Sequence, residues 1–506
     1  MYNILDYLEE SARKYPNKVA FADLEKEITY QDLVVKAKRI GNRLSENFEL
    51  GMPVPIFMDK SVDTICLFFG AVYAECFYVM LDTKQPKTRL NHIMNTLETD
   101  RVVTSNKYLS ILERLEFKGQ VIMIEDLFVS HQQDTIPEVR LQKHIDTMPL
   151  YCIFTSGSTG VPKGVLVSHR NVIDFIDVFV ESFGINENDV IGNQAPWDFD
   201  VSVKDIYSTI KAGATMQIIP KQFFSMPTKL LDFLCEREVT TIIWAVSAVC
   251  IISTLKGFEY KVPLNLTKIM FSGEVMPVKQ LQIWQKYIPN AMYVNLYGPT
   301  EITCNCTYHI IDREYALGEV IPIGKPFPNE KVFLLDNDDC EVTKYGAIGE
   351  ICVSGTAVSL GYYNNKEQTQ KAFCQNPLNK YYMEIIYRTG DLGYYNDDEN
   401  LCFTSRKDFQ IKHMGHRIEL GEIENMMNKV EVIQRSCCIF ENNKIIAFYD
   451  GEIERRELIR VLKKDLPVFM IPNVFYKIDR FPITKNGKID RKKLSDMIKE
   501  EFDVSA

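Results

Sequence analysis

Between residues 151 and 169 the chain reads YCIFTSGSTGVPKGVLVSH, in which hydroxyl side chains, glycines and a lysine separate two apolar runs. Glycines let a backbone approach a ligand closely, and hydroxyls, free amides and a lysine donate hydrogen bonds to phosphate oxygens. The spacing is not the GxxxxGK pattern with a following Ser or Thr, because no hydroxyl follows Lys163. The stretch indicates a polyphosphate loop of another kind, and a flexible surface hairpin is the simpler alternative. The loop residues expected to contact phosphate are Thr155, Ser156, Gly157, Ser158, Thr159, Gly160 and Lys163.

A second cluster, NLYGPTE from Asn295 to Glu301, combines a turn, an aromatic ring, a hydroxyl and a carboxylate. A tyrosine exposed at a turn can stack on a base. A carboxylate near a phosphate loop can hold Mg²⁺, a hard cation that requires oxygen ligands. A plain Gly-Pro turn is the alternative for this stretch alone.

Charged clusters continue toward the C-terminus. Asp391 follows a glycine in YRTGDL, where a carboxylate can accept hydrogen bonds from ribose hydroxyls. The stretch RKDFQIKHMGHRIELGEIE, from Arg406 to Glu424, changes from basic to acidic, and PITKNGKIDRKKL is a lysine-rich turn that contains Lys488. Taken singly, these stretches are also consistent with an ordinary turn, a solvated linker and a charged surface.

The pattern of apolar runs indicates which elements position these clusters. The first 30 residues read as an amphipathic helix and then, in VAFADLEKEITY, as a hairpin around acidic turn residues. Strand-like and helical runs then alternate to about residue 330, which is typical of α/β layers with mainly parallel sheets. Residues 331–405 read as short strands with Asn, Asp and Gly turns, and helices with one hairpin follow Asp408. We predict a large α/β domain with a small β-rich portion over residues 1–407 and a small α+β domain over residues 408–506.

The composition excludes several classes of protein. The 506 residues are too many for a single core, and the net charge of −10 without a long basic run argues against a nucleic-acid partner. The N-terminus is acidic and polar, unlike a signal peptide, and no apolar run approaches the roughly 20 residues of a membrane span. The 13 cysteines form no CxxC pair and mostly stand in apolar contexts. Buried free thiols in a reducing cytoplasm are therefore expected.

The order and spacing of all these clusters resemble the adenylate-forming superfamily, which includes acyl-CoA synthetases, firefly luciferase and the adenylation domains of peptide synthetases. FTSGSTGVPKG, NLYGPTE, YRTGDL, the block from Arg406 to Glu424 and NGK match in order over nearly the whole chain. Within the superfamily the chain looks most like the amino-acid-activating branch, and most closely like D-alanine–D-alanyl carrier protein ligase. The stretches that carry this closer resemblance are NQAPWDFDVSVKDIY, FSGEVMP and KDFQIKHMGHRIELGEIE.

The resemblance implies a reaction in two steps that uses ATP and Mg²⁺. A carboxylate first attacks the α-phosphate of ATP and forms an acyl adenylate and pyrophosphate. The phosphopantetheine thiol of a carrier protein then forms a thioester and releases AMP. The chain ends soon after the small domain and shows no pantetheine-attachment motif, so we expect a separate carrier protein.

The resemblance also implies roles for individual residues. Glu301 would bind Mg²⁺, Thr300 would contact the α-phosphate and Tyr297 would stack on adenine, whose edge Asn295 or the backbone near Gly273 would read. The other residues expected at the ATP site are Glu274, Leu296 and Gly298.

The resemblance implies further roles in binding ribose, in the reaction itself and in domain movement. Asp391 and Arg406 would hold the ribose hydroxyls. Lys488 would bridge the substrate carboxylate and the α-phosphate, and His169 would lie near that carboxylate. Asp408 would be the hinge about which the small domain rotates between the two steps.

Asp200 indicates the class of substrate. In WDFDVSV it matches the residue that pairs with the substrate's α-ammonium in amino-acid-activating members, and a buried carboxylate without such a partner would be costly. Hydrogen bonding to backbone amides is the alternative. The side-chain pocket is expected to be lined by Val201, Lys204, Trp244, Ala245, Met270, Ser272, Leu296, Cys304 and Asn305.

The pocket is more polar than an alanine methyl group requires. Lys204, Ser272 and Asn305 depart from what the D-alanine ligase resemblance implies. If Lys204 points inward, a polar or acidic side chain is expected, whereas Asp198 or Asp205 could pair with it outside the pocket. Alanine of either hand and serine are the first candidates, and an acidic amino acid is the third.

The leading functional hypothesis is thus a ligase that adenylates an amino acid and loads it onto a carrier protein. An acyl- or aryl-CoA synthetase is a second hypothesis, which Asp200 disfavours. A non-catalytic nucleotide-binding regulator is a third hypothesis, from a different class.

Overall fold

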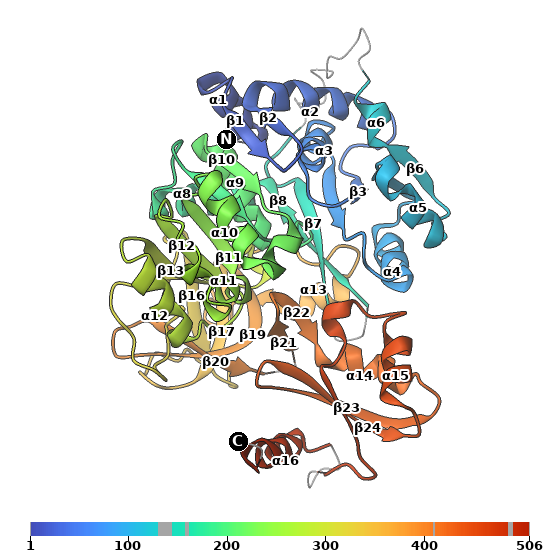
Figure 1. The fold of residues 1–506 in the computed structure, drawn as a ribbon, viewed down its shortest axis with the longest axis vertical. Helices are drawn as coiled ribbons and strands as arrows, with labels where there is room; N and C mark the ends of the chain where they lie inside the picture. The colour runs from blue at the N-terminus through green and yellow to red at the C-terminus, as the bar shows by residue number, and fades with distance from the viewer. Residues whose placement is uncertain (1, 130–143, 157–160, 408–409, 484–488, 505–506) are drawn as a thin grey trace. The chain divides into compact units, whose positions relative to one another are not determined.

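The computed structural model describes residues 2–129, 144–156, 161–407, 410–483 and 489–504 (Figure 1). The chain forms two compact units. The larger comprises Met1–Thr83, Leu97–Ile153 and Gly164–Lys407, and the smaller comprises Lys84–Thr96, Phe154–Lys163 and Asp408–Ala506. The smaller unit thus includes two short segments, Lys84–Thr96 and Phe154–Lys163, that were predicted to belong to the large domain. The boundary at residue 408 lies outside the described residues and stays a prediction.

Two sheets with mainly parallel strands dominate the larger unit, which confirms the α/β class. The first has nine strands in the order β15 (Lys325–Pro326), β14 (Thr307–Ile310), β13 (Met292–Tyr297), β12 (Lys268–Ser272), β11 (Thr241–Ala245), β9 (Val190–Asn193), β10 (Thr215–Ile218), β1 (Val19–Ala22) and β2 (Glu27–Thr29). The second has six in the order β6 (Gln120–Met123), β5 (Arg101–Thr104), β3 (Pro53–Phe57), β4 (Phe77–Leu81), β7 (Pro149–Thr155) and β8 (Lys163–Ser168). The predicted hairpin is formed by β1 and β2, which pair antiparallel.

The β-rich portion predicted for residues 331–405 is a five-stranded sheet that begins one residue earlier. Its strands are β16 (Glu330–Leu335), β17 (Gly349–Gly355), β18 (Phe373–Gln375), β19 (Ile385–Tyr395) and β20 (Leu401–Arg406). Its pairs are antiparallel, and Asp391 on β19 stands opposite Arg406 on β20. The expected turn-rich sheet is therefore confirmed.

Helices alternate with the strands along most of the first 407 residues. In chain order they are α1 (Leu5–Lys14), α2 (Tyr30–Leu44), α3 (Val62–Tyr73), α4 (Lys87–Leu97), α5 (Asn106–Arg114), α6 (Ile124–Leu127), α8 (His169–Phe183), α9 (Val201–Ala212), α10 (Pro227–Glu236), α11 (Val246–Thr254), α12 (Val278–Tyr287) and α13 (Lys366–Ala372), with short 3₁₀ turns η1 (Lys221–Ser225), η2 (Gly257–Glu259) and η3 (Thr300–Ile302). Local signals set the ends of several helices. Ser168 and Asn171 form a capping box at the start of α8, and Gly213 in the left-handed conformation ends α9.

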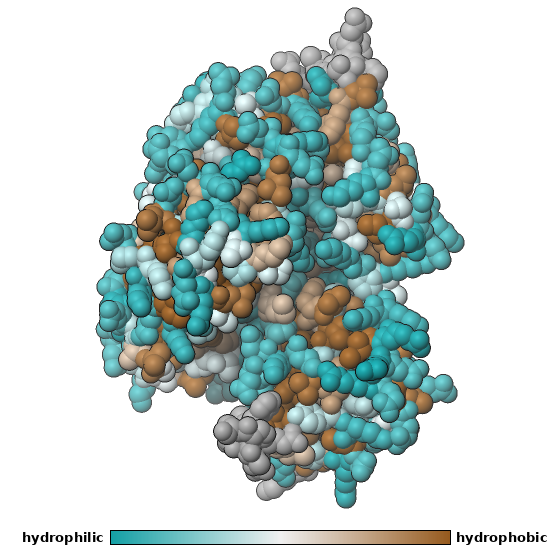
Figure 2. Space-filling view, in the orientation of Figure 1, coloured by the Kyte–Doolittle hydropathy of each residue, from teal (hydrophilic) through white to brown (hydrophobic). Residues whose placement is uncertain are grey.

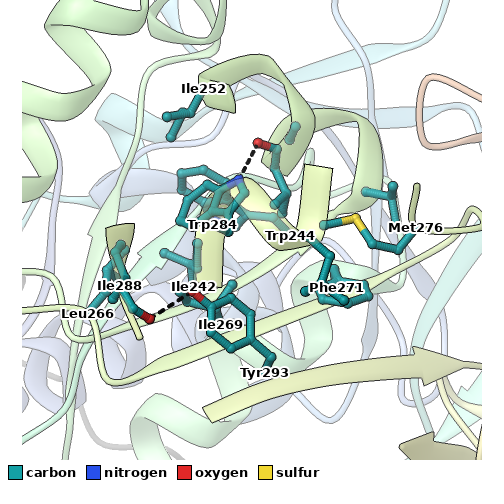
Figure 3. Close-up of a cluster of buried hydrophobic side chains, with 14 of the residues drawn as sticks. Ile242, Trp244, Ile252, Leu266, Ile269, Phe271, Met276, Trp284, Ile288 and Tyr293 are labelled. Carbon is teal, nitrogen blue, oxygen red and sulfur yellow. Dashed lines mark hydrogen bonds between the residues drawn. The ribbon is translucent and has the colours of Figure 1, made fainter. Parts of the chain in front are cut away.

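One face of the nine-stranded sheet is packed with large apolar side chains (Figure 3). Ile242 and Trp244 of β11 and Phe271 of β12 point into this core, where Trp284 of α12 lies completely buried. The indole nitrogen of Trp284 donates to the carbonyl of Val249, 3.1 Å away, so the polar atom of this ring is satisfied. Because side chains alternate along a strand, the neighbouring residues of β11 and β12 face the opposite side of the sheet.

The smaller unit includes a three-stranded sheet and a two-stranded one. These are formed by β23 (Ile433–Glu441), β24 (Lys444–Gly451) and β25 (Val474–Lys477), and by β21 (Gln410–His413) and β22 (His416–Glu419), with helices α14 (Leu420–Asn428), α15 (Arg455–Leu462) and α16 (Arg491–Val504) and the turn η4 (Val468–Met470). The predicted hairpin is β23 and β24. The helix predicted from Ile418 begins only at Leu420, because Ile418 pairs with Ile411 across the two-stranded sheet.

On the face that Figure 2 shows, hydrophobic residues are interspersed with hydrophilic ones. Within the described ranges, no helix combines the length and the hydrophobicity that a bilayer crossing requires. All 13 cysteines are free thiols, and most of them are buried, as their apolar contexts predicted.

Candidate functional site

Three residues predicted to hold the nucleotide lie together in the larger unit. The hydroxyl of Tyr297, at the end of β13, donates to Oδ2 of Asp391 over 2.5 Å. Arg406 forms an ion pair with Oδ1 of the same carboxylate, across the β19–β20 ladder. Residues more than 90 positions apart in sequence are thereby joined by one carboxylate.

Burial makes this arrangement specific. Asp391 is 1% exposed, and a buried carboxylate is tolerated only where donors surround it. Burial raises the pKa of Tyr297 well above its usual value, and the charge of Asp391 raises it further. Tyr297 therefore remains a hydroxyl donor at any physiological pH. The stacking of Tyr297 on adenine and the contact of Asp391 with ribose stay predictions.

Glu301, the predicted Mg²⁺ ligand, is completely buried on η3. Its Oε1 accepts a hydrogen bond of 2.8 Å from the hydroxyl of Tyr362, and its carbonyl accepts one of 2.9 Å from the backbone amide of Ser359. Tyr362 was not predicted as a site residue, because a tyrosine in GYY has no spacing that relates it to a residue about 60 positions earlier. Tyr362 positions the carboxylate of Glu301.

The donor set is compatible with Mg²⁺ bound chiefly to a nucleotide. The described residues contain no group of three or more His, Cys, Asp or Glu side chains arranged to hold a metal ion. Mg²⁺ commonly takes only one or two protein carboxylates and completes its shell with phosphate and water oxygens. Glu301 would supply one such oxygen.

Close backbone packing shapes the segment after NLYGPTE. A Cβ on Gly298 would lie 2.5 Å from the Cα of Asn305 and 2.6 Å from the carbonyl of Cys304, so only glycine fits there. Thr303 and Cys304 have φ values of 55° and 90°, in the left-handed region that residues with side chains seldom adopt. This bend brings Asn305 back toward the ends of the parallel strands.

The opposite face of the sheet presents several predicted pocket residues. Ala245, Ser272 and Leu296 stand in register at the ends of β11, β12 and β13. Met270 stands two residues before Ser272 and so shares this face. The prediction for Trp244 is wrong, because its side chain belongs to the apolar core on the other face and its indole nitrogen donates to the carbonyl of Gly192 at 2.7 Å.

Lys204 reaches toward this same face. It is completely buried, and its Nζ lies 2.6 Å from Oδ1 of Asn305 and 3.5 Å from Oγ of Ser272. The open choice between an inward and an outward lysine is thus decided, since its hydrogen bonds go to two predicted pocket residues and not to Asp198 or Asp205. Cys304 lies beside the group, and its sulfur is 3.6 Å from Oδ1 of Asn305.

Asp200 lies at the start of α9, one residue before the half-buried Val201. It is half-buried and not fully buried as expected, because it stands at a helix N-terminus. Its side chain forms no capping hydrogen bond with α9, and its pairing with a substrate ammonium group stays a prediction. Burial raises the pKa of the Cys304 thiol to about 12. The positive charge of Lys204 lowers this pKa and the negative charge of Asp200 raises it, so both charged groups act on the Cys304 thiol.

His169 begins α8, and its observed contacts are with the N-terminal segment. Its Nδ1 accepts a hydrogen bond of 3.2 Å from the amide of Ile4, and its ring meets that of His144 edge-on. Burial lowers the pKa of His169 well below its usual value, so the ring is neutral at physiological pH. A role at the substrate carboxylate stays a prediction.

Four other residues expected at the ATP site lie on or next to β12, β13 and η3. Asn295 donates to the carbonyl of Pro322 at 2.8 Å, and Gly273 follows β12 with a φ of 93°, which favours glycine. Thr300 is buried on η3, and Glu274 is half-buried.

Parts of the predicted phosphate loop can also be located. Thr155 ends β7, Lys163 begins β8, and Ser156 follows Thr155 as a buried residue. The strands on either side of the loop are therefore those expected from YCIF and GVLV. The other predicted residues Gly157, Ser158, Thr159, Gly160, Asp408 and Lys488 lie outside the described residues.

Comparison with known proteins identifies the family. Residues 8–363, more than half of the chain, match the model of the AMP-binding enzyme family. The chain belongs to this family. The predicted membership of the adenylate-forming superfamily is thereby confirmed, and the closer likeness to D-alanine ligase stays a prediction.

Relatives in the AMP-binding enzyme family include peptide synthetases. Tyrocidine synthase 1 of Brevibacillus parabrevis is 29% identical over 503 residues, which are 97% of this chain and 45% of that protein. Zwittermicin A synthase ZmaJ of Bacillus cereus is 30% identical over 504 residues, which are 96% of this chain and 93% of that protein. The chain thus spans less than half the length of tyrocidine synthase 1, and it spans 11% of gramicidin S synthase 2 of Brevibacillus brevis.

Solved structures share the fold. The Vibrio cholerae adenylation domain AlmE in complex with glycyl-adenosine-5'-phosphate has a TM-score of 0.84 at 21% identity, with 98% of each chain covered. IdnL1 has a TM-score of 0.79 at 23% identity, with 95% of this chain and 99% of that chain covered. At these identities the likeness shows the fold alone.

The hydrogen bond between Tyr362 and Glu301 leads to a prediction about stability. Tyr362→Phe removes a donor from a buried carboxylate, so the free energy of unfolding should fall by about 1–3 kcal/mol. Chemical denaturation measures this change. Tyr363→Phe is the matched control, because the Tyr363 hydroxyl forms no hydrogen bond with any described residue. Equal losses in the two variants would show that Tyr362 does not hold Glu301.

Proposed function

We propose that the protein adenylates an amino acid with ATP and transfers the aminoacyl group to the phosphopantetheine thiol of a carrier protein. The observation that carries the proposal is the buried group of Tyr297, Asp391 and Arg406, which unites separate parts of the sequence around one carboxylate. Family membership supports adenylate formation, and the position of Asp200 supports a substrate with an α-ammonium group.

The first step joins two anions. An oxygen of the substrate carboxylate attacks the α-phosphorus of ATP, and the bond from that phosphorus to the bridging oxygen breaks, so pyrophosphate leaves. Mg²⁺ would supply charge neutralisation for the phosphates, with Glu301 as a protein ligand. Lys488 would neutralise the charge that develops between the carboxylate and the α-phosphate. Thr155, Lys163 and the loop between them would hold the outer phosphates.

The second step transfers the acyl group. The thiol loses its proton, its sulfur attacks the acyl carbon, and the bond from that carbon to the adenylate oxygen breaks, which releases AMP. The thioester product requires a carrier that bears phosphopantetheine. NpsA-ThdA, an artificially fused adenylation and PCP di-domain from Klebsiella oxytoca with a TM-score of 0.81, joins this fold to a PCP domain and supports this proposal. Rotation of residues 408–506 about Asp408 would separate the two steps.

Pyrophosphate exchange tests the proposed function directly. Amino-acid-dependent exchange of labelled pyrophosphate into ATP supports it. Exchange with fatty or aryl acids alone would favour an acyl- or aryl-CoA synthetase, and exchange with no carboxylate would favour a nucleotide-binding regulator.

Lys488→Ala should lower adenylate formation about 100-fold or more, because the lysine charge stabilises only the first transition state. Thioester formation from pre-made aminoacyl adenylate should stay close to that of the unsubstituted protein. Single-turnover assays of each step measure this split, with Lys492→Ala on α16 as the control. A similar loss in both steps would contradict the proposed role.

Asp408→Pro should leave pyrophosphate exchange largely intact and slow carrier loading, because proline restricts φ at the proposed hinge. Asp408→Ala, which keeps the backbone free to rotate, is the control. Rates of exchange and of carrier aminoacylation are compared for both variants. Normal loading by Asp408→Pro would rule out a hinge at this residue.

Asp200→Ala should abolish exchange with amino acids, since the α-ammonium group would lose its counter-charge. Acids that have the same carbon skeleton without the amino group should lose much less. Asp200→Asn, which keeps the shape and removes the charge, should behave like the alanine variant. Retained preference for the amino group would refute this role of Asp200.

A further inference from the structure

The ammonium group of Lys204 lacks an anionic partner. It is completely buried, and its hydrogen bonds go to the neutral groups of Asn305 and Ser272. Over the described ranges, no carboxylate oxygen lies within the 4.0 Å of an ion pair from its Nζ. A charge removed from water without a counter-charge is costly, so this lysine has a strong requirement for an anion.

The neighbouring Asp205 does not meet this requirement. Its Oδ2 accepts a hydrogen bond of 2.6 Å from Nδ2 of Asn193, and its Oδ1 has no hydrogen-bond partner. Burial raises the pKa of Asp205 to about 7, although Lys204 and Lys60 lower it. At neutral pH this carboxyl is therefore only partly ionised, and it is directed to β9 rather than to the group around Lys204.

The arrangement places Lys204 beside the position proposed for the substrate. Asp200 and Lys204 are four residues apart at the start of α9, so they lie on one face of the helix about one turn apart. The bend after Gly298 delivers Asn305 to the same place, and Ser272 comes from the end of β12. A carboxylate and an ammonium group thus lie about one helical turn apart on the same face of α9.

This pair of charges matches an acidic amino acid. The α-ammonium group of such a substrate would meet Asp200, and its side-chain carboxylate would meet Lys204 with the amide of Asn305 and the hydroxyl of Ser272 as further polar partners. An alanine methyl would add no polar partner to this group, and neither an alanine methyl nor a serine hydroxyl would supply a counter-charge for the lysine.

We infer that the protein activates an amino acid with a carboxylate side chain, aspartate or glutamate, and that Lys204 binds that carboxylate. The inference rests on the proposed function and goes beyond it by naming the substrate class. It also places an acidic side chain ahead of the alanine and serine that the sequence pattern favoured.

Substrate profiling of the unsubstituted protein provides the first test. Pyrophosphate exchange is measured with both enantiomers of aspartate, glutamate, asparagine, glutamine, alanine and serine, and kcat/KM is compared. Each amide has the shape of its acid without the charge. One acid should exceed its own amide by about tenfold or more, since a site built for a charged group rejects its neutral analogue, and it should exceed alanine and serine as well.

Lys204→Met tests the residue. It conserves the length and bulk of the side chain and removes the charge, so kcat/KM for the preferred acid should fall about 100-fold or more while the amide changes much less. Lys211→Met is the matched control on the same helix, because Lys211 pairs with Asp177 and not with the residues around Lys204. The control should keep the acid preference of the unsubstituted protein.

Each outcome decides the inference. Higher kcat/KM for alanine, serine or an amide, or an acid preference that persists in Lys204→Met, would overturn it while the proposed function stands. Exchange with no amino acid would overturn the proposed function and this inference together. If Lys204→Met does not fold, the comparison of acids with amides in the unsubstituted protein decides the matter alone.

Discussion

The alternation of side chains along β11, β12 and β13 is the constraint on which the candidate site depends. On one face of these strands, large apolar residues pack with Trp284 into a core that excludes water. On the other face, Ala245, Ser272 and Leu296 stand in register at the strand ends. A shift of one residue in any of these strands would exchange the two sets, so the packing of the core fixes the position of the site.

The candidate site contains three buried charged groups, and they differ in how far neighbouring protein groups neutralise their charge. Asp391 accepts from a tyrosine hydroxyl and pairs with an arginine, so its charge is well satisfied. Glu301 is oriented by Tyr362 and would be neutralised further by a metal ion. Lys204 has only neutral partners. A bound ligand can supply the counter-charge for a buried charged group that has none within the protein. Asp391 already has such a partner, whereas Lys204 has none among the described residues, so Lys204 is the better candidate for a substrate contact.

Substrate identity is a finer property than fold or family. Tyrocidine synthase 1 and the AlmE adenylation domain resemble this chain over nearly its whole length, at 29% and 21% identity. Under the proposed function, a few side chains between α9 and the strand ends would select the amino acid, and they lie on the face of the sheet opposite the apolar core. The charges of Asp200 and Lys204 are therefore more informative about the substrate than the overall likeness.

The sequence by itself determined much about this protein. Strand and helix patterns specified the α/β class, because the periodicity of apolar residues reflects local geometry. The motifs NLYGPTE and YRTGDL each contain groups that suit a nucleotide, and their order along the chain carried the resemblance to the adenylate-forming superfamily. Asp200, Ser272 and Asn305 became candidate substrate residues through the resemblance to amino-acid-activating members of the superfamily.

Only the tertiary structure decided how these residues are partnered. From the sequence, Lys204 could point into the predicted pocket or pair with a carboxylate outside it. Its hydrogen bonds to Asn305 and Ser272 depend on the bend at Cys304, which the close packing at Gly298 permits. Trp244 and Ala245 are adjacent in sequence, yet the pairing of β11 with β12 sends one to the core and the other to the site. Tyr362 meets Glu301 because the segment after β17 returns to η3. Such contacts depend on long-range packing, which local sequence patterns do not encode.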